Sequence, residues 1–401
     1  MVVKNIQALR AIAANAVLVS HLFIVEQKYS HGGAVLSANA HFGAFGVDLF
    51  FVISGFIMAT IARNVSWHKF LFDRAMRIMP PYWFYTTLIL IVSFYVPAYV
   101  NSSFEHPPSI WRSYLLIPDS VGPLLAVGWT LMHEMYFYLC FAVMISLIGA
   151  FRFRITSLLL IWAVAVICLN AVVRLTEIGD PVVAVIVHPL TLEFVFGAAA
   201  GIVIQKNCTA FAASTFVGGI IIFMLVLSLS DGAPGLIDGQ NWKRVILVGA
   251  PCALIVYGLV GIEIKDRQTA PYWLVALGNA SYSTYLSHVL VLSAIGRMFA
   301  LMPNHNVYFE TTFVIICIIA ANIVGLLSCG LIERRPGKRL RAWPPRALTA
   351  GHKSSGHPDP EHKSPGHPNR SAGTSLFHSA VPPPRSRAPI SARPGDRSRG
   401  T

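Results

Sequence analysis

Two ionisable side chains, Arg10 and His21, lie at the start of the chain in its first long apolar segment, ALRAIAANAVLVSHLF. Ionisable groups are costly inside a membrane, so they usually face a protein interior or a water-filled cavity and mark a pathway or a reaction centre. The separation of eleven residues is about three helical turns, or roughly 16 Å along the axis, so both side chains share one helix face. The spacing predicts that Arg10 binds an anion near the membrane surface. His21 would then place an imidazole near or beyond the midplane of a hydrocarbon layer about 30 Å thick.

A second basic pair, Arg74 and Arg77, precedes the third apolar segment in the stretch FLFDRAMRIMPPYWFY. Residues three apart lie on one face of a short helix, and Pro80 and Pro81 are expected to end that helix before a new span begins. Guanidinium groups bind phosphate through bidentate, charge-assisted hydrogen bonds. The pair is therefore a candidate phosphate site at the membrane surface. The alternative is a basic anchor that only sets the topology.

Glu134 lies about one turn inside the fourth apolar segment, which begins WTLMHEMYFYL. It shares a helix face with Thr130, Tyr138 and roughly Trp129, whereas His133 points elsewhere and is assigned a structural role. A carboxylate at this depth should be paired or protonated. Glu134 is therefore a candidate for acid–base chemistry, with the holding together of helices as the alternative.

Two further polar positions could contact a substrate. Asp48 lies at or just inside the membrane edge in FGVDLFFVISGFIM, where capping of a helix is the alternative role. In SYSTYLSH, the spacing i, i+4, i+7 places Ser281, Tyr285 and His288 on one helix face. This polar stripe could line a cavity or hold helices together.

The composition identifies the elements that must position these residues. Hydrophobic residues make up 55% of the chain and charged residues only 12%, whereas soluble domains carry about a quarter charged residues. We therefore expect an all-α, polytopic membrane bundle of about ten transmembrane helices. The sixth segment contains Glu193 and the ninth contains GNASYSTYLSH, so either could be broken or re-entrant. The apolar segments are 9–25, 45–62, 82–100, 129–149, 156–173, 182–204, 212–229, 244–262, 272–298 and 310–332.

The loop charges predict the orientation of the bundle, because cytoplasmic loops carry an excess of Lys and Arg. The odd-numbered loops are poor in both, as in DGAPGLIDGQ, so both termini are expected in the cytoplasm. No cleavable signal is evident, since EQKYSHGG follows the first apolar segment. The basic residues of the even-numbered loops are Arg63, Lys69, Arg74, Arg77, Arg152, Arg154, Lys206, Lys265 and Arg267, followed by RRPGKRLR.

The chain is expected to divide into a membrane domain, residues 1–342, and a tail, residues 343–401. The tail is rich in Pro, Gly, Ser, His and Arg and cannot bury a core, so it should be disordered. Its basic character suggests contact with anionic lipid headgroups, and the net charge of +13 gives no support for nucleic-acid binding. The six cysteines have no CxxC spacing and are expected to be small buried hydrophobes, with no disulfide framework and no metal site.

The order of these motifs resembles the acyltransferase-3 family over residues 4 to about 340. The motifs are Arg-x10-His, GVDLFFVISGF, RxxRIxPxYW, W[ST]LxxExxFY, SYxxYLxH and a closing ExxP at Glu333 and Pro336. Such membrane enzymes move acetyl or other short acyl groups onto hydroxyls of exported sugars, and the likeness is greatest to the exopolysaccharide O-acetyltransferase branch. The resemblance implies a ten-helix bundle in a bacterial-type inner membrane, cytoplasmic acyl-CoA as donor, and an essential Arg10 and His21.

Two departures from the family pattern stand out. Thr130 replaces the usual serine after the tryptophan, which is a mild change. No esterase-like domain follows the last span, so a stand-alone enzyme is expected rather than a two-domain relay.

The resulting hypothesis is transfer of an acetyl group from acetyl-CoA to a hydroxyl of a polysaccharide or its lipid-linked repeat unit. His21 would be the general base, because imidazole titrates near working pH, or would accept the acyl group covalently. Glu134 would orient or recharge it. No permanently bound cofactor is expected. The expected partners are acyl-CoA, a glycan or lipid-linked oligosaccharide, membrane lipids and, as a possible further partner, polysaccharide synthesis machinery. The expected CoA-binding residues are Arg10, Arg74 and Arg77, and the expected substrate-binding residues are Asp48, Trp129, Tyr285 and His288.

The main rival is a proton-coupled transporter or flippase that uses His21, Glu134 and His288 as a proton relay. An inverted repeat would support it, but the basic pair and the Trp-to-Glu motif occur only in the first half of the chain. Two more hypotheses are a non-catalytic scaffold for a polysaccharide synthase and an acyltransferase that acts on lipid or peptidoglycan.

Overall fold

The computed structural model describes residues 3–29, 35–36, 40, 43–62, 65–100, 106–229, 242–302 and 306–334. Several features predicted from the sequence lie outside the described residues. These are the tail 343–401, Arg63, Pro336 and the loop 231–240.

Every regular element in the described ranges is helical, which confirms the all-α prediction. Within the described residues, eight helices or pairs of consecutive helical segments are long and apolar enough to cross a membrane, which indicates an integral multi-pass membrane protein. Two further elements occupy expected spans: α2 is shorter, at 17 residues, and α12 has 29 residues but carries the polar stretch near its middle. The helices at the ten expected apolar segments are α1 (Lys4–Tyr29), α2 (Phe45–Ile61), α3 (Trp67–Tyr95), α5 (Gly128–Phe151), α6 (Ile155–Thr176), α7 (Pro181–Ile186) with α8 (Thr191–Gln205), α9 (Ala212–Leu229), α10 (Trp242–Arg244) with α11 (Ala250–Asp266), α12 (Tyr272–Ala300) and α13 (Val307–Ser328).

Helix α3 corrects one prediction, because Pro80 and Pro81 do not end it. The helix runs without interruption from Trp67 to Tyr95 and contains both prolines. Proline removes a backbone donor, but membrane helices tolerate it where neighbouring helices supply polar contacts. The carbonyls that lose a donor are those of Met76 and Arg77. The Tyr282 hydroxyl of α12 donates to the next carbonyl, that of Ile78, at 2.8 Å and so joins α12 to α3 beside the prolines. The basic pair therefore sits inside a long helix, not at the end of a short one.

The sixth expected span is broken, whereas the ninth is continuous. Helix α7 ends at Ile186 and α8 begins at Thr191, so non-helical backbone interrupts this span. In the break, His188 accepts a hydrogen bond from the Leu190 backbone N–H through Nδ1, at 3.3 Å. Glu193 lies in the first turn of α8 and is fully buried. The eighth span is also irregular, since the π-helix η5 (Val245–Gly249) separates α10 from α11.

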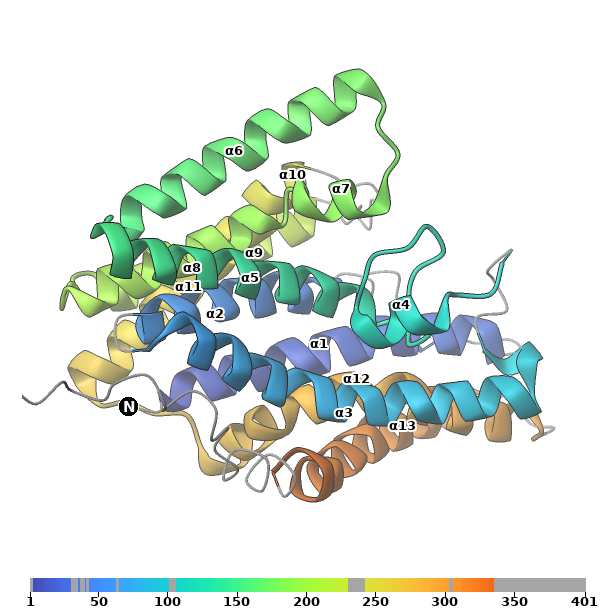
Figure 1. Ribbon diagram of the computed structural model, residues 1–401. Helices are drawn as coiled ribbons and strands as arrows, with labels where there is room; N and C mark the ends of the chain where they lie inside the picture. Colours follow the sequence, from blue (N-terminus) through green and yellow to red (C-terminus); the bar gives the residue numbers. More distant parts are fainter. Residues whose placement is uncertain are drawn as a thin grey trace, which may run out of the picture. The chain divides into compact units, whose positions relative to one another are not determined.

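Close backbone contacts bring the helices of the site together. Helices α1 and α12 run side by side, with α13 next to α12 (Figure 1). A Cβ at Gly278 of α12 would lie 1.8 Å from the Gln7 carbonyl oxygen of α1, and a Cβ at Gly197 of α8 would lie 1.8 Å from the Val52 carbonyl oxygen of α2. Small residues at helix contacts permit this approach in membrane proteins. The pairs α1–α12 and α2–α8 are therefore set at short, well-defined distances.

The cysteines follow the prediction only in part. Cys252, Cys317 and Cys329 are buried, but Cys168 and Cys208 are exposed. Cys168 lies on α6, where exposure to lipid is no penalty, and Cys208 lies between α8 and α9. The expectation that all six are buried is therefore wrong.

Candidate active site

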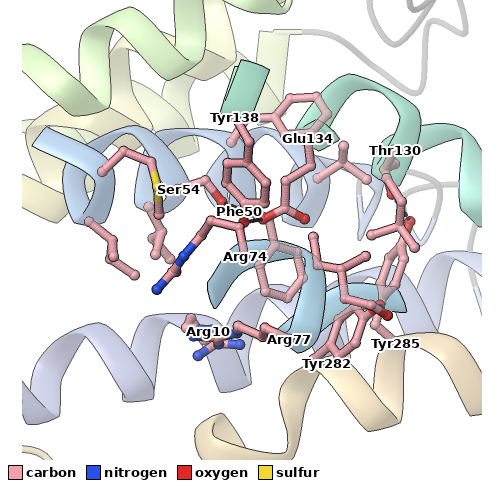
Figure 2. A pocket seen from close by; sticks show the side chains of 17 residues that line it. Arg10, Phe50, Ser54, Arg74, Arg77, Thr130, Glu134, Tyr138, Tyr282 and Tyr285 are labelled. Atoms are coloured by element: carbon pink, nitrogen blue, oxygen red, sulfur yellow. Dashed lines mark hydrogen bonds between the residues drawn. The ribbon is translucent and has the colours of Figure 1, made fainter. Parts of the chain in front are cut away.

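A pocket between five helices collects most of the polar residues singled out by the sequence (Figure 2). Arg10 comes from α1, Arg74 and Arg77 come from α3, Glu134 comes from α5, and Tyr285 comes from α12. The cavity has a volume of about 70 Å³, which is room for a few water molecules or a group of similar size. Side chains of α2 form an apolar wall that includes Phe50, Ile53 and Ile57.

The three arginines give the pocket a strongly basic lining. Arg10 is 8% exposed and donates to the Gln7 side-chain oxygen at 3.2 Å. The charge of Arg77 acts against that of Arg10, and in Figure 2 these two side chains lie next to each other. The Nε atom of Arg74 is buried and has no hydrogen-bond partner. Buried donors are nearly always paired in folded proteins, so an unpaired one beside two other guanidinium groups is an opening for an anion.

Two carboxylates oppose this positive charge. Glu134 accepts hydrogen bonds from the Ser54 hydroxyl of α2, at 3.2 Å, and from the Tyr138 hydroxyl one turn further along α5. The expectation that this carboxylate has partners is therefore met. Glu333, in the π-helix η6 (Cys329–Arg334), accepts from the Ser283 hydroxyl at 2.9 Å, and both carboxylates attract the Arg10 guanidinium. The basic lining of the pocket is thus partly balanced by one carboxylate in the lining, Glu134, and by Glu333 outside it.

His21 does not line this pocket, and its side-chain partner is a second histidine. The Nδ1 atom of His21 lies 3.0 Å from the Val17 carbonyl oxygen and 3.4 Å from Nε2 of His288. The two rings meet edge to face, with their centroids 5.0 Å apart. Glu134 makes its hydrogen bonds to Ser54 and Tyr138, so its role in orienting or recharging His21 stays a prediction.

Tyr285 connects the histidine pair to the pocket. Its ring centroid lies 5.8 Å from that of His288, and its hydroxyl lies 2.8 Å from the Thr130 hydroxyl of α5. Tyr285 and Thr130 both line the pocket. A run of polar side chains therefore leads from the arginines, through these two hydroxyls, to the paired imidazoles.

Asp48 and Trp129 lie apart from the pocket lining. Asp48 is fully buried in an ion pair with Arg244, which donates to its two oxygens at 2.8 and 2.7 Å. Helix capping is not its role, since it lies inside α2 and its side chain binds another helix. Trp129 stacks edge to face with His133, which contacts His188 in the same way. Their expected contact with substrate remains a prediction that the geometry of the pocket does not favour.

Several residues of the site were not selected as site residues from the sequence. Ser54 and Tyr282 line the pocket, Arg244 neutralises Asp48, and the charge of Glu333 attracts that of Arg10. For Arg244 and Glu333 a signal existed, because each is a charged residue at the edge of an apolar segment and such residues need partners. For Ser54 and Tyr282 none existed, because hydroxyls are common on membrane helices.

Comparison with known proteins adds three findings. The family described as "Acyltransferase domain" matches residues 3–330. The exopolysaccharide production protein ExoZ of Rhizobium meliloti (strain 1021) is 30% identical over 320 residues, which cover 77% of this chain and 93% of that protein. The acyltransferase MdmB of Streptomyces mycarofaciens is 25% identical over 324 residues, covering 72% and 78%. No solved structure gives a significant match.

Proposed function

We propose a function from the premise that this chain belongs to the acyltransferase-3 family of membrane acyltransferases. In this proposal, the protein transfers an acetyl or other short acyl group from acyl-CoA to a hydroxyl of an exported polysaccharide or its lipid-linked repeat unit. The choice of acceptor follows from the likeness to a protein named for exopolysaccharide production. The choice of donor rests on the pocket.

The observation that carries this proposal is the cluster of three arginines with one buried, unpaired Nε–H group. CoA carries several phosphates, and guanidinium groups bind phosphate through charge-assisted bonds that are about twice as strong as neutral ones. Arg10, Arg74 and Arg77 line the same pocket although they come from two helices. The apolar wall of α2 beside them suits the uncharged arm that carries the thioester.

The orientation of the bundle supports a cytoplasmic donor. The loop charges predict that both termini lie in the cytoplasm, and α1 and α3 would then begin at the cytoplasmic surface. Arg10, Arg74 and Arg77 lie within the first three turns of those helices. The basic pocket then faces the compartment that supplies acyl-CoA, and His21 lies about 16 Å deeper than Arg10.

The reaction requires one proton acceptor and one bond exchange. The hydroxyl oxygen of the acceptor attacks the thioester carbonyl carbon, a C–O bond forms, and the C–S bond breaks. His21 takes the hydroxyl proton, and the departing thiolate receives a proton in turn, which leaves free CoA and an O-acyl product. In the alternative route, His21 first attacks the thioester and forms an acyl-imidazole as the thiolate leaves. The acceptor hydroxyl then attacks the acyl-imidazole, which releases His21 and gives the same O-acyl product.

The test uses purified protein in nanodiscs with acetyl-CoA labelled in the acetyl group and with envelope glycans from cells that lack the gene. Label should enter the glycan only when the protein is present, and mass spectrometry of glycans from cells with and without the gene should differ by the mass of that acyl group. Label that enters lipid or peptidoglycan instead would change the acceptor class. No thioester turnover by the folded protein would overturn the enzymatic proposal and favour a transporter or a scaffold.

A further inference from the structure

We infer that His288 is a positioning residue for His21, not a substrate ligand: its ring accepts the Nδ1–H of His21 and so holds the His21 Nε2 lone pair ready to take a proton. The inference rests on the proposed function for its catalytic meaning. The hydrogen-bond arrangement itself does not depend on that function, so the two can fail separately.

The hydrogen-bond partners determine which nitrogen of His21 carries the proton. A carbonyl oxygen can only accept, and the Val17 carbonyl lies 3.0 Å from Nδ1 of His21. Nδ1 must therefore be the N–H of the neutral ring, and Nε2 must be the lone-pair nitrogen. His21 thereby holds its basic nitrogen on the side of the ring away from its own helix backbone.

The same reasoning applies to His288. Its Nδ1 lies 3.3 Å from the Thr284 carbonyl oxygen, so this nitrogen is also an N–H donor in the neutral ring. The lone pair of His288 is then on Nε2, which lies 3.4 Å from Nδ1 of His21. The His21 N–H thus points at two acceptors, and both tautomers agree with every contact of the pair.

Burial separates the roles of the two rings. His288 is 1% exposed, and each of its nitrogens already has a partner on α1 or α12. His21 is only partly buried. A ligand that approaches the pair therefore meets His21 first, and His288 has no free nitrogen to offer it.

Packing between α1 and α12 fixes the distance between the rings. A Cβ at Gly278 would lie 1.8 Å from the Gln7 carbonyl oxygen, and a Cβ at Gly296 would lie 2.7 Å from the Tyr29 ring. The histidine pair lies between these two close approaches along both helices. Close contacts between α1 and α12 on both sides of the histidine pair thus fix the separation of the two rings, as a positioned base requires.

The pair also stabilises the charge that forms during transfer. When Nε2 of His21 takes the hydroxyl proton, the ring becomes an imidazolium. The bond from its Nδ1–H to Nε2 of His288 then becomes charge-assisted and stronger. The proton leaves from Nε2 to the thiolate, so His288 needs to gain no proton at any step.

Kinetics of two His288 variants test this role. His288→Gln keeps an acceptor oxygen near the position of Nε2 but cannot titrate, so kcat should stay within a few-fold of wild type. His288→Leu removes the acceptor and should lower kcat by at least about tenfold, but by no more than the roughly 10²–10⁴-fold that a positioned base contributes. The KM for acyl-CoA and the KM for the acceptor should stay unchanged. His133→Leu is the matched control, because His133 is also buried and bonds its own i−4 carbonyl but has no contact with His21 among its ring partners.

Three outcomes would overturn the inference. A raised KM for the acceptor with unchanged kcat would make His288 a substrate ligand. Complete loss of activity in a folded His288→Gln protein would make it a proton carrier. Wild-type kcat in His288→Leu would give it no role.

Solid-state NMR of the full-length protein labelled with ¹⁵N-histidine tests the arrangement without any turnover. Nδ1 of both rings should be protonated, and a ¹⁵N–¹⁵N coupling across the hydrogen bond should join His21 to His288. A neutral His21 protonated on Nε2 would refute the inference even if transfer is observed. Conversely, the expected spectrum with no acyl transfer by the wild-type protein would leave the pair in place and refute the proposed function.

Discussion

Replacing Arg74 by alanine should weaken acyl-CoA binding far more than acceptor binding. Arg74 lines the basic pocket, and its Nε–H is buried without a hydrogen-bond partner. An anionic ligand would satisfy this donor and so gain a bond that the free protein lacks. The alanine variant removes that gain, and it also removes one of three like charges, so the empty protein should not lose stability.

The magnitude follows from the kind of bond that is lost. A hydrogen bond to a charged group contributes about 1.5–3 kcal/mol, which corresponds to about a ten- to a hundredfold change in binding constant. The Nε atom of Arg74 is buried, so screening by water is weaker there than at an open surface, and the value should lie in this range. Arg74→Lys keeps the charge but has no planar fork, so its affinity should fall between those of wild type and Arg74→Ala.

The assay is steady-state kinetics in nanodiscs at several salt concentrations, with acyl-CoA and acceptor varied in turn. The KM for acyl-CoA should rise in the alanine variant, whereas the KM for the acceptor should not. The donor affinity of wild type should weaken as salt rises, and that dependence should be smaller in the variant. Arg154→Ala is the matched control, because Arg154 is an exposed arginine between α5 and α6, outside the pocket lining.

One result would refute the reasoning. If the correctly inserted double variant Arg74→Ala/Arg77→Ala keeps its KM for acyl-CoA, the pocket does not bind phosphate. Lysine that works as well as arginine, together with alanine that disturbs insertion, would instead support a purely topological role.

Three further changes test other parts of the site. His21→Ala should abolish acyl transfer with near-normal yield of folded protein, because close approaches such as that of Gly278 to the Gln7 carbonyl still join α1 to α12 when the His21–His288 contact is lost; product at the wild-type rate would eliminate His21 as base or nucleophile. Glu134→Gln should lower kcat strongly while the thermal midpoint changes little, since the amide oxygen can still accept from Ser54; a folding defect would favour a helix-holding role. Asp48→Leu should destabilise the protein by about 3–5 kcal/mol, because it removes the carboxylate that pairs with the buried Arg244; thermal unfolding in detergent should show that Asp48→Leu/Arg244→Met regains part of the lost stability.

The sequence alone determined the class of fold and most members of the basic pocket. Apolar segments of spanning length can only form helices in a membrane, because every backbone group needs a partner there. The cost of ionisable groups in lipid then turns Arg10 and Glu134 inward whatever their neighbours are. These are local constraints, so they can be read from one segment at a time.

The tertiary structure decided which of these side chains meet. His21 bonds His288, which is 267 residues away along the chain, and Asp48 bonds Arg244, which is 196 residues away. Neither pairing is encoded in a local pattern, because each depends on how closely two helix backbones approach and on their relative rotation. That approach is set by small residues such as Gly278 against the Gln7 carbonyl, and a shift of one residue along either helix would rotate every facing side chain by about 100°.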